Sequence, residues 1–404
     1  MAARPFEQRR VVLGVTGGIA SYKAAWLARL LTQSGAEVDV VMTRAAREFV
    51  GAVTFEALTG RPVHTDLFAA GQALDHIALA RSAHAIVVAP ATADFMARAA
   101  HGQADDLLTA CLLAADAPVL LVPAMNDRMW LHRQTALNVA HLRELGYVVL
   151  DPEIGALAAG EGIGAGRMPE PETILAHVGR ILDGDGMFRS RRVLVTAGAT
   201  REPVDPVRFL SNRSSGKMGV AIAEAAWRRG AEVTLIAGSM SVPAPVGARV
   251  VTVESTAAMR DAVAEHLPSA DVFVMAAAPA DFRPAEVANS KIKKSAAPKS
   301  LELAPTDDIL LATRELRPAG LITVGFALET EAALVGGREK AARKELDLVV
   351  VNDAREPGAG FAADTNRVSL IVRGQEEPDV LPLLSKTEVA DAILDRVEGL
   401  MRAP

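Results

Sequence analysis

The sequence predicts an α/β protein of two doubly wound, Rossmann-like domains, each built on a parallel sheet. First, short β-branched runs alternate with longer segments rich in Ala and Leu that have helical period, a pattern typical of βαβ units. Second, this alternation stops at a polar stretch containing glycine and then starts again. Third, the length of 404 residues allows two or three domains that each bury a core.

The first domain is predicted over residues 1–185. Its expected elements are, in order, strand 11–15, helix 26–33, strand 38–42, strand 85–89, helix 105–115 and strand 119–122. A stretch rich in Gly and Ala follows over 151–172 and has too few bulky side chains for a core element. It is either a surface linker or a lid over an active site. A short helix is expected at 174–181.

The second domain is predicted over residues 190–404, after the polar stretch 183–192. Its expected elements are strand 193–196, helix 218–229, strand 233–237, strand 272–276, strand 321–324 and strand 346–351. Residues 368–372 are expected to form an edge strand. Ser385 and Glu388 have the spacing of a capping box, which predicts a last helix running to about Leu400.

Composition excludes several classes of protein. Hydrophobic residues make up 50% of the chain and charged residues 23%, which argues against disorder and a coiled coil. The formal charge of −6 argues against a nucleic-acid partner, since neutralising phosphates requires a basic face. The most apolar run, 107–125, is interrupted by Asp116, Pro118 and Pro123, so no membrane span is expected. The single cysteine, Cys111, excludes a disulfide framework and suits the reducing cytoplasm.

The first predicted strand runs into a glycine turn, Gly17-Gly18, and then into a helix. Backbone amides in such a turn can hold a phosphate at the helix N-terminus. The turn lacks the G-x-G-x-x-G spacing, and the second strand leads into Thr43 and Arg44, where a dinucleotide fold has an acid for the ribose. A hydroxyl and a cation favour a phosphate over a ribose diol. An ordinary glycine turn is the alternative interpretation.

Polar side chains follow two further strands, Thr92 and Asp94 in one loop and Asn126 in the other. Because ligands in open parallel sheets bind beyond the carboxyl ends of the strands, we expect these groups to converge. His76 precedes another predicted strand. A lone histidine in a loop is more often a solvated or capping residue than a catalyst.

Four segments of this half together resemble a known family: residues 17–20 (Gly-Gly-Ile-Ala), 76–79 (His-Ile-Ala-Leu), 90–94 (Pro-Ala-Thr-Ala-Asp) and 123–130, which combines Pro-Ala-Met-Asn with Met-Trp. They are similar to the flavin-dependent cysteine decarboxylases, which bind FMN as an electron sink. The resemblance implies that His76 is the acid/base at the reacting thiol and that Asn126 holds the substrate carboxylate. It also implies FMN contacts from Gly18, Ser21, Thr43, Thr92 and Asp94.

A long polar loop over residues 196–219 opens the second half and leads into a predicted helix. Ser214-Ser215-Gly216-Lys217 at the helix start suits an anion, but Ser211 stands where a P-loop has its upstream glycine, so this is no Walker A motif. Asp281 follows a later strand and precedes a run of lysines, Lys291, Lys293 and Lys294. Such a run is usually a solvated face. Near a strand end and an aspartate in an acidic protein, it also suits a triphosphate with Mg²⁺.

These elements of the second half resemble those of the phosphopantothenate-cysteine ligases. Essentially the whole chain is therefore similar to the bifunctional coenzyme A biosynthesis family. In that family a phosphopantothenoylcysteine decarboxylase is fused to the ligase. The resemblance implies that CTP activates 4'-phosphopantothenate as an acyl-cytidylate and that cysteine attacks it. Asn212 and Lys291 are then expected to be catalytic, and Asp281 to bind Mg²⁺. The other expected substrate-binding residues are Arg208, Ala276, Ala277, Asp307, Asp308, Ile309, Leu310, Phe326, Lys340 and Lys344.

The resemblance further implies a cytoplasmic homo-oligomer with decarboxylase trimers and ligase dimers. Phe326 has an alternative interpretation as an ordinary core residue.

The predicted lid departs from the family pattern. The family carries a cysteine in an Ala-Cys-Gly segment, whose role is to donate a proton, whereas here residues 158–161 read Ala-Ala-Gly-Glu and the segment is one residue longer. The alternative hypothesis is therefore a ligase whose flavin-binding decarboxylase domain is impaired or regulatory. Glu161 is the candidate replacement donor, while Cys111 in a core helix is expected to be inert.

Overall fold

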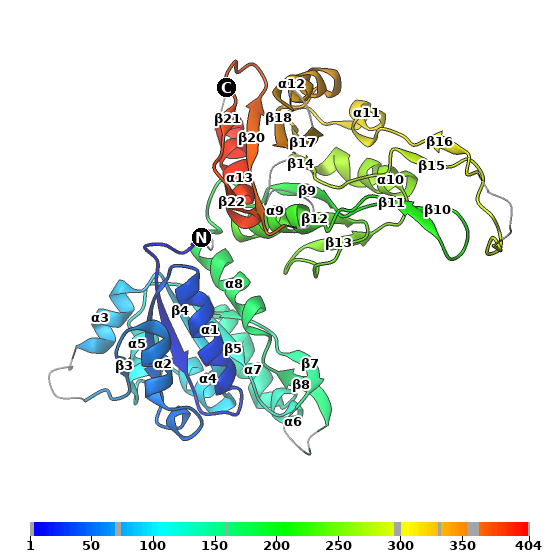
Figure 1. Cartoon of the computed structure of the whole chain (residues 1–404). Coiled ribbons are helices and arrows are strands. Elements are labelled where there is room, and N and C mark those ends of the chain that lie inside the picture. The colour runs from blue at the N-terminus through cyan, green and yellow to red at the C-terminus, as the bar shows by residue number, and fades with distance from the viewer. Residues whose placement is uncertain are drawn as a thin grey trace. The chain divides into compact units, whose positions relative to one another are not determined.

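The computed structural model describes residues 4–68, 74–157, 160, 162–294, 300–329, 333–353 and 363–402. The chain divides into two compact units, residues 2–182 and residues 183–404, each built on its own sheet (Figure 1). No helix among the described residues is long and apolar enough to cross a membrane.

The first unit contains a six-stranded parallel sheet in the order β3-β2-β1-β4-β5-β6. Its strands are β1 (Arg10–Val15), β2 (Glu37–Met42), β3 (Val63–His64), β4 (Ala85–Ala91), β5 (Val119–Pro123) and β6 (Val148–Val149). Its helices are α1 (Ser21–Gln33), α2 (Ala52–Thr59), α3 (Asp75–Ser82), α4 (Ala93–Ala100), α5 (Leu107–Leu113), α6 (Asp127–Trp130), α7 (Arg133–Glu144) and α8 (Pro171–Asp183).

The sheet of the first unit is covered on both faces, as a doubly wound fold requires. Successive side chains of a strand point to opposite faces, and β1 divides its side chains between two hydrophobic clusters. Val11, Leu13 and Val15 belong to one cluster and Val12 to the other. The predicted α/β architecture is confirmed for this unit. The stretch rich in Gly and Ala forms an antiparallel hairpin, β7 (Glu153–Ala156) and β8 (Ile163–Arg167).

The second unit contains an eight-stranded sheet in the order β13-β12-β9-β14-β17-β18-β20-β21. These strands are β9 (Arg192–Ala197), β12 (Glu232–Ala237), β13 (Arg249–Thr252), β14 (Val272–Met275), β17 (Ile322–Glu329), β18 (Leu348–Asp353), β20 (Val368–Val372) and β21 (Asp379–Val380). Its helices are α9 (Lys217–Arg228), α10 (Thr256–His266), α11 (Ile309–Ala312), α12 (Ala333–Lys344) and α13 (Lys386–Arg402).

Three two-stranded sheets complete this unit. They pair β10 (Arg201–Pro203) with β11 (Phe209–Ser211), β15 (Phe282–Pro284) with β16 (Leu303–Pro305), and β19 (Thr365–Asn366) with β22 (Leu384–Ser385). In the large sheet the pairs from β13 to β18 are parallel, but β20 and β21 are antiparallel additions. The expected edge strand at 368–372 is therefore not the edge, because β21 pairs with its outer side. A two-residue strand has no detectable sequence period, which is why it was missed.

The last helix begins at the predicted capping box. Ser385 N–H donates to Glu388 Oε2 at 2.8 Å, and Glu388 N–H donates to Ser385 Oγ at 3.3 Å. Lys386 is consequently the first residue of α13. The predicted helix start is confirmed, and its physical cause is the reciprocal satisfaction of two backbone donors.

Cys111 lies on α5 in the core of the first unit and is fully buried. Burial raises the pKa of its thiol to about 12, so the reactive thiolate is absent at ordinary pH. We expect the native protein to resist Ellman's reagent at pH 8 and to release one equivalent of thiol on unfolding in urea. Rapid labelling of the native protein would show that the α5 region opens readily.

Candidate active sites

Hydrogen bonds join the carboxyl ends of β1 and β4 in the first unit. Thr16 Oγ1 donates to the Pro90 carbonyl at 2.7 Å, and the Thr92 N–H donates back to Thr16 Oγ1 at 3.2 Å. Thr92 is also the N-cap of α4, where its hydroxyl accepts from the Phe95 N–H at 3.2 Å. Two of the loops expected to carry a cofactor thus lie side by side.

The Gly17-Gly18 turn packs against the loop that follows β2. A Cβ on Gly17 would lie 2.4 Å from the Cβ of Ala45, so this close approach requires glycine. The N-cap of α1 makes no side-chain hydrogen bond, and the first turn of the helix contains no acidic residue. The N-terminal amides and the positive end of the helix dipole are therefore suited to an anion.

The hydroxyls of Ser21 and Thr43 form hydrogen bonds with the backbone of this region. Ser21 is fully buried, and its Oγ donates to the Gly18 carbonyl at 2.6 Å. Thr43 is buried too, and its Oγ1 accepts from the Ala46 N–H at 3.3 Å. Asp94, by contrast, is exposed in the first turn of α4 and pairs with Arg98 at 3.2 Å. The Ser21 and Thr43 hydroxyls thus hold the backbone of the turns, and the contacts of all three residues with FMN remain predictions.

His76 is the second residue of α3, and its Nδ1 is buried without a hydrogen-bond partner in the described part of the chain. The preceding Asp75 pairs with His64 Nδ1 at 3.2 Å. A buried ring nitrogen without a partner is unfavourable. A bound ligand that supplied a partner would remove this cost.

Asn126 is the N-cap of α6 and follows β5, and its Oδ1 accepts from the Arg128 N–H at 2.9 Å. The β7–β8 hairpin lies directly on this turn, since the Met125 N–H donates to the Gly166 carbonyl at 3.0 Å. A Cβ on Gly166 would stand 2.2 Å from the Met125 carbonyl oxygen. The hairpin is therefore held against the Asn126 turn. Residues 158, 159 and 161, including Glu161, lie outside the described residues.

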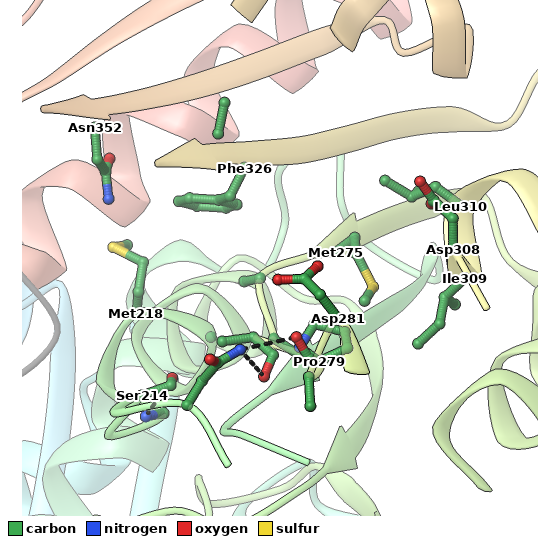
Figure 2. Close-up of a pocket in the computed structure, with 18 of the residues that line it drawn as sticks. Ser214, Met218, Met275, Pro279, Asp281, Asp308, Ile309, Leu310, Phe326 and Asn352 are labelled. Carbon is green, nitrogen blue, oxygen red and sulfur yellow. Dashed lines mark hydrogen bonds between the residues drawn. The ribbon is translucent and has the colours of Figure 1, made fainter. Parts of the chain in front are cut away.

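A cavity of about 530 Å³ opens beyond β14 and along β17 and β18 in the second unit (Figure 2). It brings together most of the positions predicted for this half, from the α9 loop, the loop after β14, the α11 start, β17 and α12. These lining residues are Asn212, Ala276, Ala277, Asp281, Asp307, Asp308, Ile309, Leu310, Phe326, Lys340 and Lys344.

Two lysines of α12 give this cavity a basic side. Lys344 is buried, and its Nζ lies 2.7 Å from Asp308 Oδ2. Lys340 Nζ donates to the Phe326 carbonyl at 2.6 Å. Both ammonium groups are thus held in fixed positions, which favours binding of a polyanion.

Two side chains point into the cavity in Figure 2, the Phe326 ring from β17 and the Asp281 carboxylate from the loop after β14. The Phe326 ring is only partly buried and lines the cavity. Asn212, which also lines the cavity, holds the loop after β14, because its Nδ2 donates to the carbonyls of Ala278 at 3.3 Å and Pro279 at 2.8 Å. The cavity therefore offers an aromatic face and a carboxylate close to its basic side.

Arg208 and Lys291 are not among the residues that line this cavity. Arg208 Nε donates to the buried Asp205 at 2.9 Å, and Arg208 also donates to the Ile292 carbonyl at 2.8 Å. Hydrogen bonds from Arg208 keep the pKa of Asp205 well below its usual range. Lys291 is exposed beside this corner, and residues 295–299 are outside the described chain. The roles of Arg208 and Lys291 remain predictions.

The cavity also contains groups that were not predicted, namely Asn352, Asn366 and Lys386. Lys386 had a detectable signal, because a lysine directly after a capping serine puts a cation at the positive end of a helix. Asn352 had a signal too, because it directly follows the predicted strand 346–351, and in the structure it lies in β18, which pairs with β17 beside Phe326. Asn366 lies in β19, which pairs with β22, and nothing in the local sequence indicates that it reaches the same cavity.

Two family models cover the chain. The Flavoprotein model matches residues 2–182, and the model of the DNA/pantothenate metabolism flavoprotein C-terminal domain matches residues 188–401. The coenzyme A biosynthesis bifunctional protein CoaBC of Mycobacterium tuberculosis H37Rv is 48% identical over 404 residues, covering 96% of both chains. The protein of that name from Bacillus subtilis is 43% identical over 399 residues, covering 98% of both.

A solved structure, the C-terminal domain of a CoaBC protein, is 37% identical and covers 53% of this chain and 97% of its own, with a TM-score of 0.46. The two family models and the nearly full-length relatives lead to one conclusion. The chain belongs to the family of bifunctional coenzyme A biosynthesis proteins, enzymes that combine a phosphopantothenoylcysteine decarboxylase with a phosphopantothenate-cysteine ligase.

Proposed function

We propose that the second unit couples cysteine to 4'-phosphopantothenate at the expense of CTP, and that the first unit decarboxylates the product to 4'-phosphopantetheine with FMN. The observation that carries the proposal is the cavity of the second unit. It gathers an aromatic face, carboxylates and fixed lysines in one place. This combination suits a nucleoside triphosphate whose α-phosphorus is to be attacked.

In the proposed ligation, Lys340 and Lys344 bind the phosphates of CTP and Phe326 contacts the base. The substrate carboxylate attacks the α-phosphorus, and pyrophosphate leaves with its charge balanced by the lysines. The cysteine amine then attacks the acyl carbon, forms the amide bond and expels CMP. Asn212, held by the carbonyls of Ala278 and Pro279, is placed to orient the acyl-cytidylate.

Mg²⁺ is proposed as the counterion of the triphosphate. Asp281 is suited to it because its carboxylate points into the cavity (Figure 2). Asp307 and Asp308 are engaged by Arg260 and Lys344. The described residues contain no cluster of three or more metal-ligating side chains. Mg²⁺ usually takes one or two carboxylates from a protein and further oxygens from substrate phosphates.

The first unit offers a site that fits FMN. The uncapped N-terminus of α1 beside Gly18 and Thr92 would hold the phosphate. The chemistry that FMN supplies when bound is acceptance of a hydride from the carbon bearing the thiol, and its return after CO₂ has left. His76 would move the thiol proton, and its unpartnered Nδ1 is available for that purpose. Asn126 would hold the carboxylate that is lost.

We expect decarboxylation to need the hairpin that lies on the Asn126 turn. We expect Gly166→Ala to slow CO₂ release at least about tenfold, because the new Cβ would push the hairpin off the Met125 carbonyl. Gly155→Ala is the matched control in the same hairpin. There the new Cβ meets the flexible side chain of Arg167. Equal effects of the two changes would rule out a specific role for the contact at Gly166.

The proposal is tested with the full chain, CTP, 4'-phosphopantothenate and cysteine. Pyrophosphate release reports ligation, CO₂ reports oxidative decarboxylation, and mass spectrometry separates 4'-phosphopantetheine from the oxidised enethiol. Full conversion to 4'-phosphopantetheine supports both activities. Pyrophosphate without CO₂ would support the alternative of a ligase with an impaired decarboxylase domain.

A cytoplasmic homo-oligomer, with decarboxylase trimers and ligase dimers, is part of the proposal. Support for self-association comes from exposed apolar side chains on both units. Tyr22 and Trp26 are exposed on α1, and Phe209 and Phe282 are exposed on β11 and β15. Contiguous apolar patches mark contact surfaces, and we expect these aromatic side chains to belong to such patches.

A further inference from the structure

A buried chain of hydrogen bonds ends at the loop after β14, and no step of the ligation described above uses it. Its members are Glu202 on β10, Thr256 at the start of α10 and Thr200, which directly precedes β10. These residues are 3%, 1% and 0% exposed, respectively. None of the three is among the residues that line the cavity. A carboxyl group and two hydroxyls that are this deeply buried require partners.

The hydrogen bonds of this chain have a direction, which Glu202 sets. Glu202 Oε1 accepts from the Thr256 N–H and from Thr256 Oγ1, both at 2.8 Å. A hydroxyl has one proton to donate, so Thr256 Oγ1 accepts from the Thr200 hydroxyl, which lies 2.9 Å away. Thr200 Oγ1 in turn accepts from the Ala280 N–H at 2.9 Å. The chain therefore runs from the Ala280 amide through two hydroxyls to Glu202.

The start of α10 explains why an acidic side chain is stable at the end of this chain. Thr256 is the first residue of the helix, and its N–H has no partner within the helix. The N-cap residue Ser255 uses its own hydroxyl to accept from the Ala258 N–H at 3.2 Å. Glu202 satisfies the Thr256 N–H, and the positive end of the helix dipole favours a carboxylate there. Glu202 is thus a fixed end from which the chain extends.

The other end of the chain holds the backbone directly before Asp281. The Ala280 carbonyl accepts from Thr306 Oγ1 at 2.5 Å, and the Asp281 carbonyl accepts from the Thr306 N–H at 3.0 Å. Both polar groups of the Ala280 backbone are therefore bound by hydroxyls, the N–H by Thr200 and the carbonyl by Thr306. The Asp281 carboxylate points from this backbone into the cavity (Figure 2). A displacement of the Ala280 N–H would therefore displace that carboxylate.

We propose that Glu202 is a positioning residue of the ligase, which acts through Thr256 and Thr200 to fix the backbone that carries Asp281. The inference rests on the proposed ligase function, in which Asp281 binds the Mg²⁺ of the triphosphate. Glu202 touches neither the metal nor a substrate. It determines where the carboxylate stands before Mg²⁺ binds, and a ligand that is already in place loses less freedom on binding.

Thr256→Val and Thr200→Val each remove one hydroxyl and keep a side chain of similar size, whereas Thr256→Ser and Thr200→Ser keep the hydroxyl. The assay is pyrophosphate release by the full chain at saturating CTP and 4'-phosphopantothenate with varied Mg²⁺. We expect each valine variant to raise the half-maximal Mg²⁺ concentration about tenfold, and each serine variant to stay within about threefold of the parent. The double valine variant should resemble either single variant, because one break already disconnects the chain.

Glu202→Met and Glu202→Gln test the fixed end of the chain in the same assay. Methionine occupies a similar volume without an acceptor oxygen, so it should raise the half-maximal Mg²⁺ concentration about as much as the valine changes. Glutamine keeps an acceptor oxygen and should stay within about threefold of the parent. If Glu202→Met folds poorly, the threonine variants still test the chain.

Val263→Ala is the matched control for loss of stability. Val263 is fully buried on α10, so its truncation weakens the packing of the same helix and leaves every link of the chain intact. Its half-maximal Mg²⁺ concentration should equal that of the parent. An equal rise in Val263→Ala and Thr256→Val would overturn the proposal, because stability alone would explain it. Additive effects of the two valine changes would overturn it too, because the hydroxyls would then act separately.

Hydrogen–deuterium exchange, followed by peptide mass spectrometry, tests the chain without turnover. We expect Thr256→Val to speed exchange in the peptide that contains the Ala280 amide, although Thr200 stands between Thr256 and that amide. Thr256→Ser should exchange at the parent rate. This result would uphold the positioning of the loop even if the parent chain released no pyrophosphate and the ligase proposal failed. Parent-like exchange in both valine variants would overturn it.

Discussion

Lys344→Met is expected to reduce kcat/KM for CTP in the ligase reaction by about 100-fold, equivalent to about 3 kcal/mol, while the bound flavin stays at the parent level. Lys344 is buried at the cavity, with its Nζ 2.7 Å from Asp308 Oδ2. The change removes a cation from the phosphates and also leaves Asp308 facing them without its partner. Both effects oppose binding of a triphosphate. Pyrophosphate release at varied CTP is the measurement.

Arg343→Gln is the matched control for this prediction. Arg343 is the neighbouring residue of α12 but is exposed, so removing its charge should change kcat/KM for CTP by less than about twofold. Comparison of the thermal unfolding of both variants shows whether folding contributes. If the two variants lose activity equally, the effect arises from the general charge of the helix and not from a position at the cavity.

His76→Asn is expected to slow CO₂ release by about 1,000-fold, the magnitude typical of a lost acid/base group. The bound flavin and the ligase rate should not change, because the ligase residues lie in the other unit. Asparagine keeps a polar group near the position of Nδ1, whose lack of a partner among the described residues makes this site sensitive. CO₂ release from synthetic 4'-phosphopantothenoylcysteine measures the decarboxylase step directly.

His101→Asn serves as the control, since His101 is an exposed residue that follows α4 in the same unit. It should decarboxylate at the parent rate. A His76→Asn enzyme that also kept the parent rate would show that His76 has a structural role, and that another group handles the thiol proton. Loss of flavin from that variant would instead place His76 at the cofactor.

The fold was largely predictable because its signals are local. The alternation of β-branched and Ala-rich segments predicts parallel sheets, and the Ser385–Glu388 spacing predicts the start of the last helix. Much of the cavity of the second unit was predictable as well, since Asp281 and its neighbours follow a strand, and parallel strands present their carboxyl ends to one edge. For this cavity, the residue types and the sheet topology both predict the same location.

The remainder depends on pairings between distant segments. Asn366 reaches the cavity on β19, which pairs with β22 just before Lys386, and the local sequence contains no information about that pairing. Arg208 is hydrogen-bonded to Asp205 and to the Ile292 carbonyl, and it does not line the cavity. Its positive charge alone does not predict this position, because the position depends on these two partners. The hairpin β7–β8 was also not foreseen, because a stretch rich in glycine has no strand period.

The route of the chain through the second unit determines when the ligase can begin to work. Its cavity uses residues from Asn212 to Lys386, so it stays incomplete on the ribosome until α13 has been synthesised. At roughly 5–20 residues per second, that delay is about 10–40 s after Asn212 is made. The decarboxylase unit has its own core within residues 2–182 and can fold during this interval. Nascent chains should therefore acquire flavin before they acquire the ability to consume CTP.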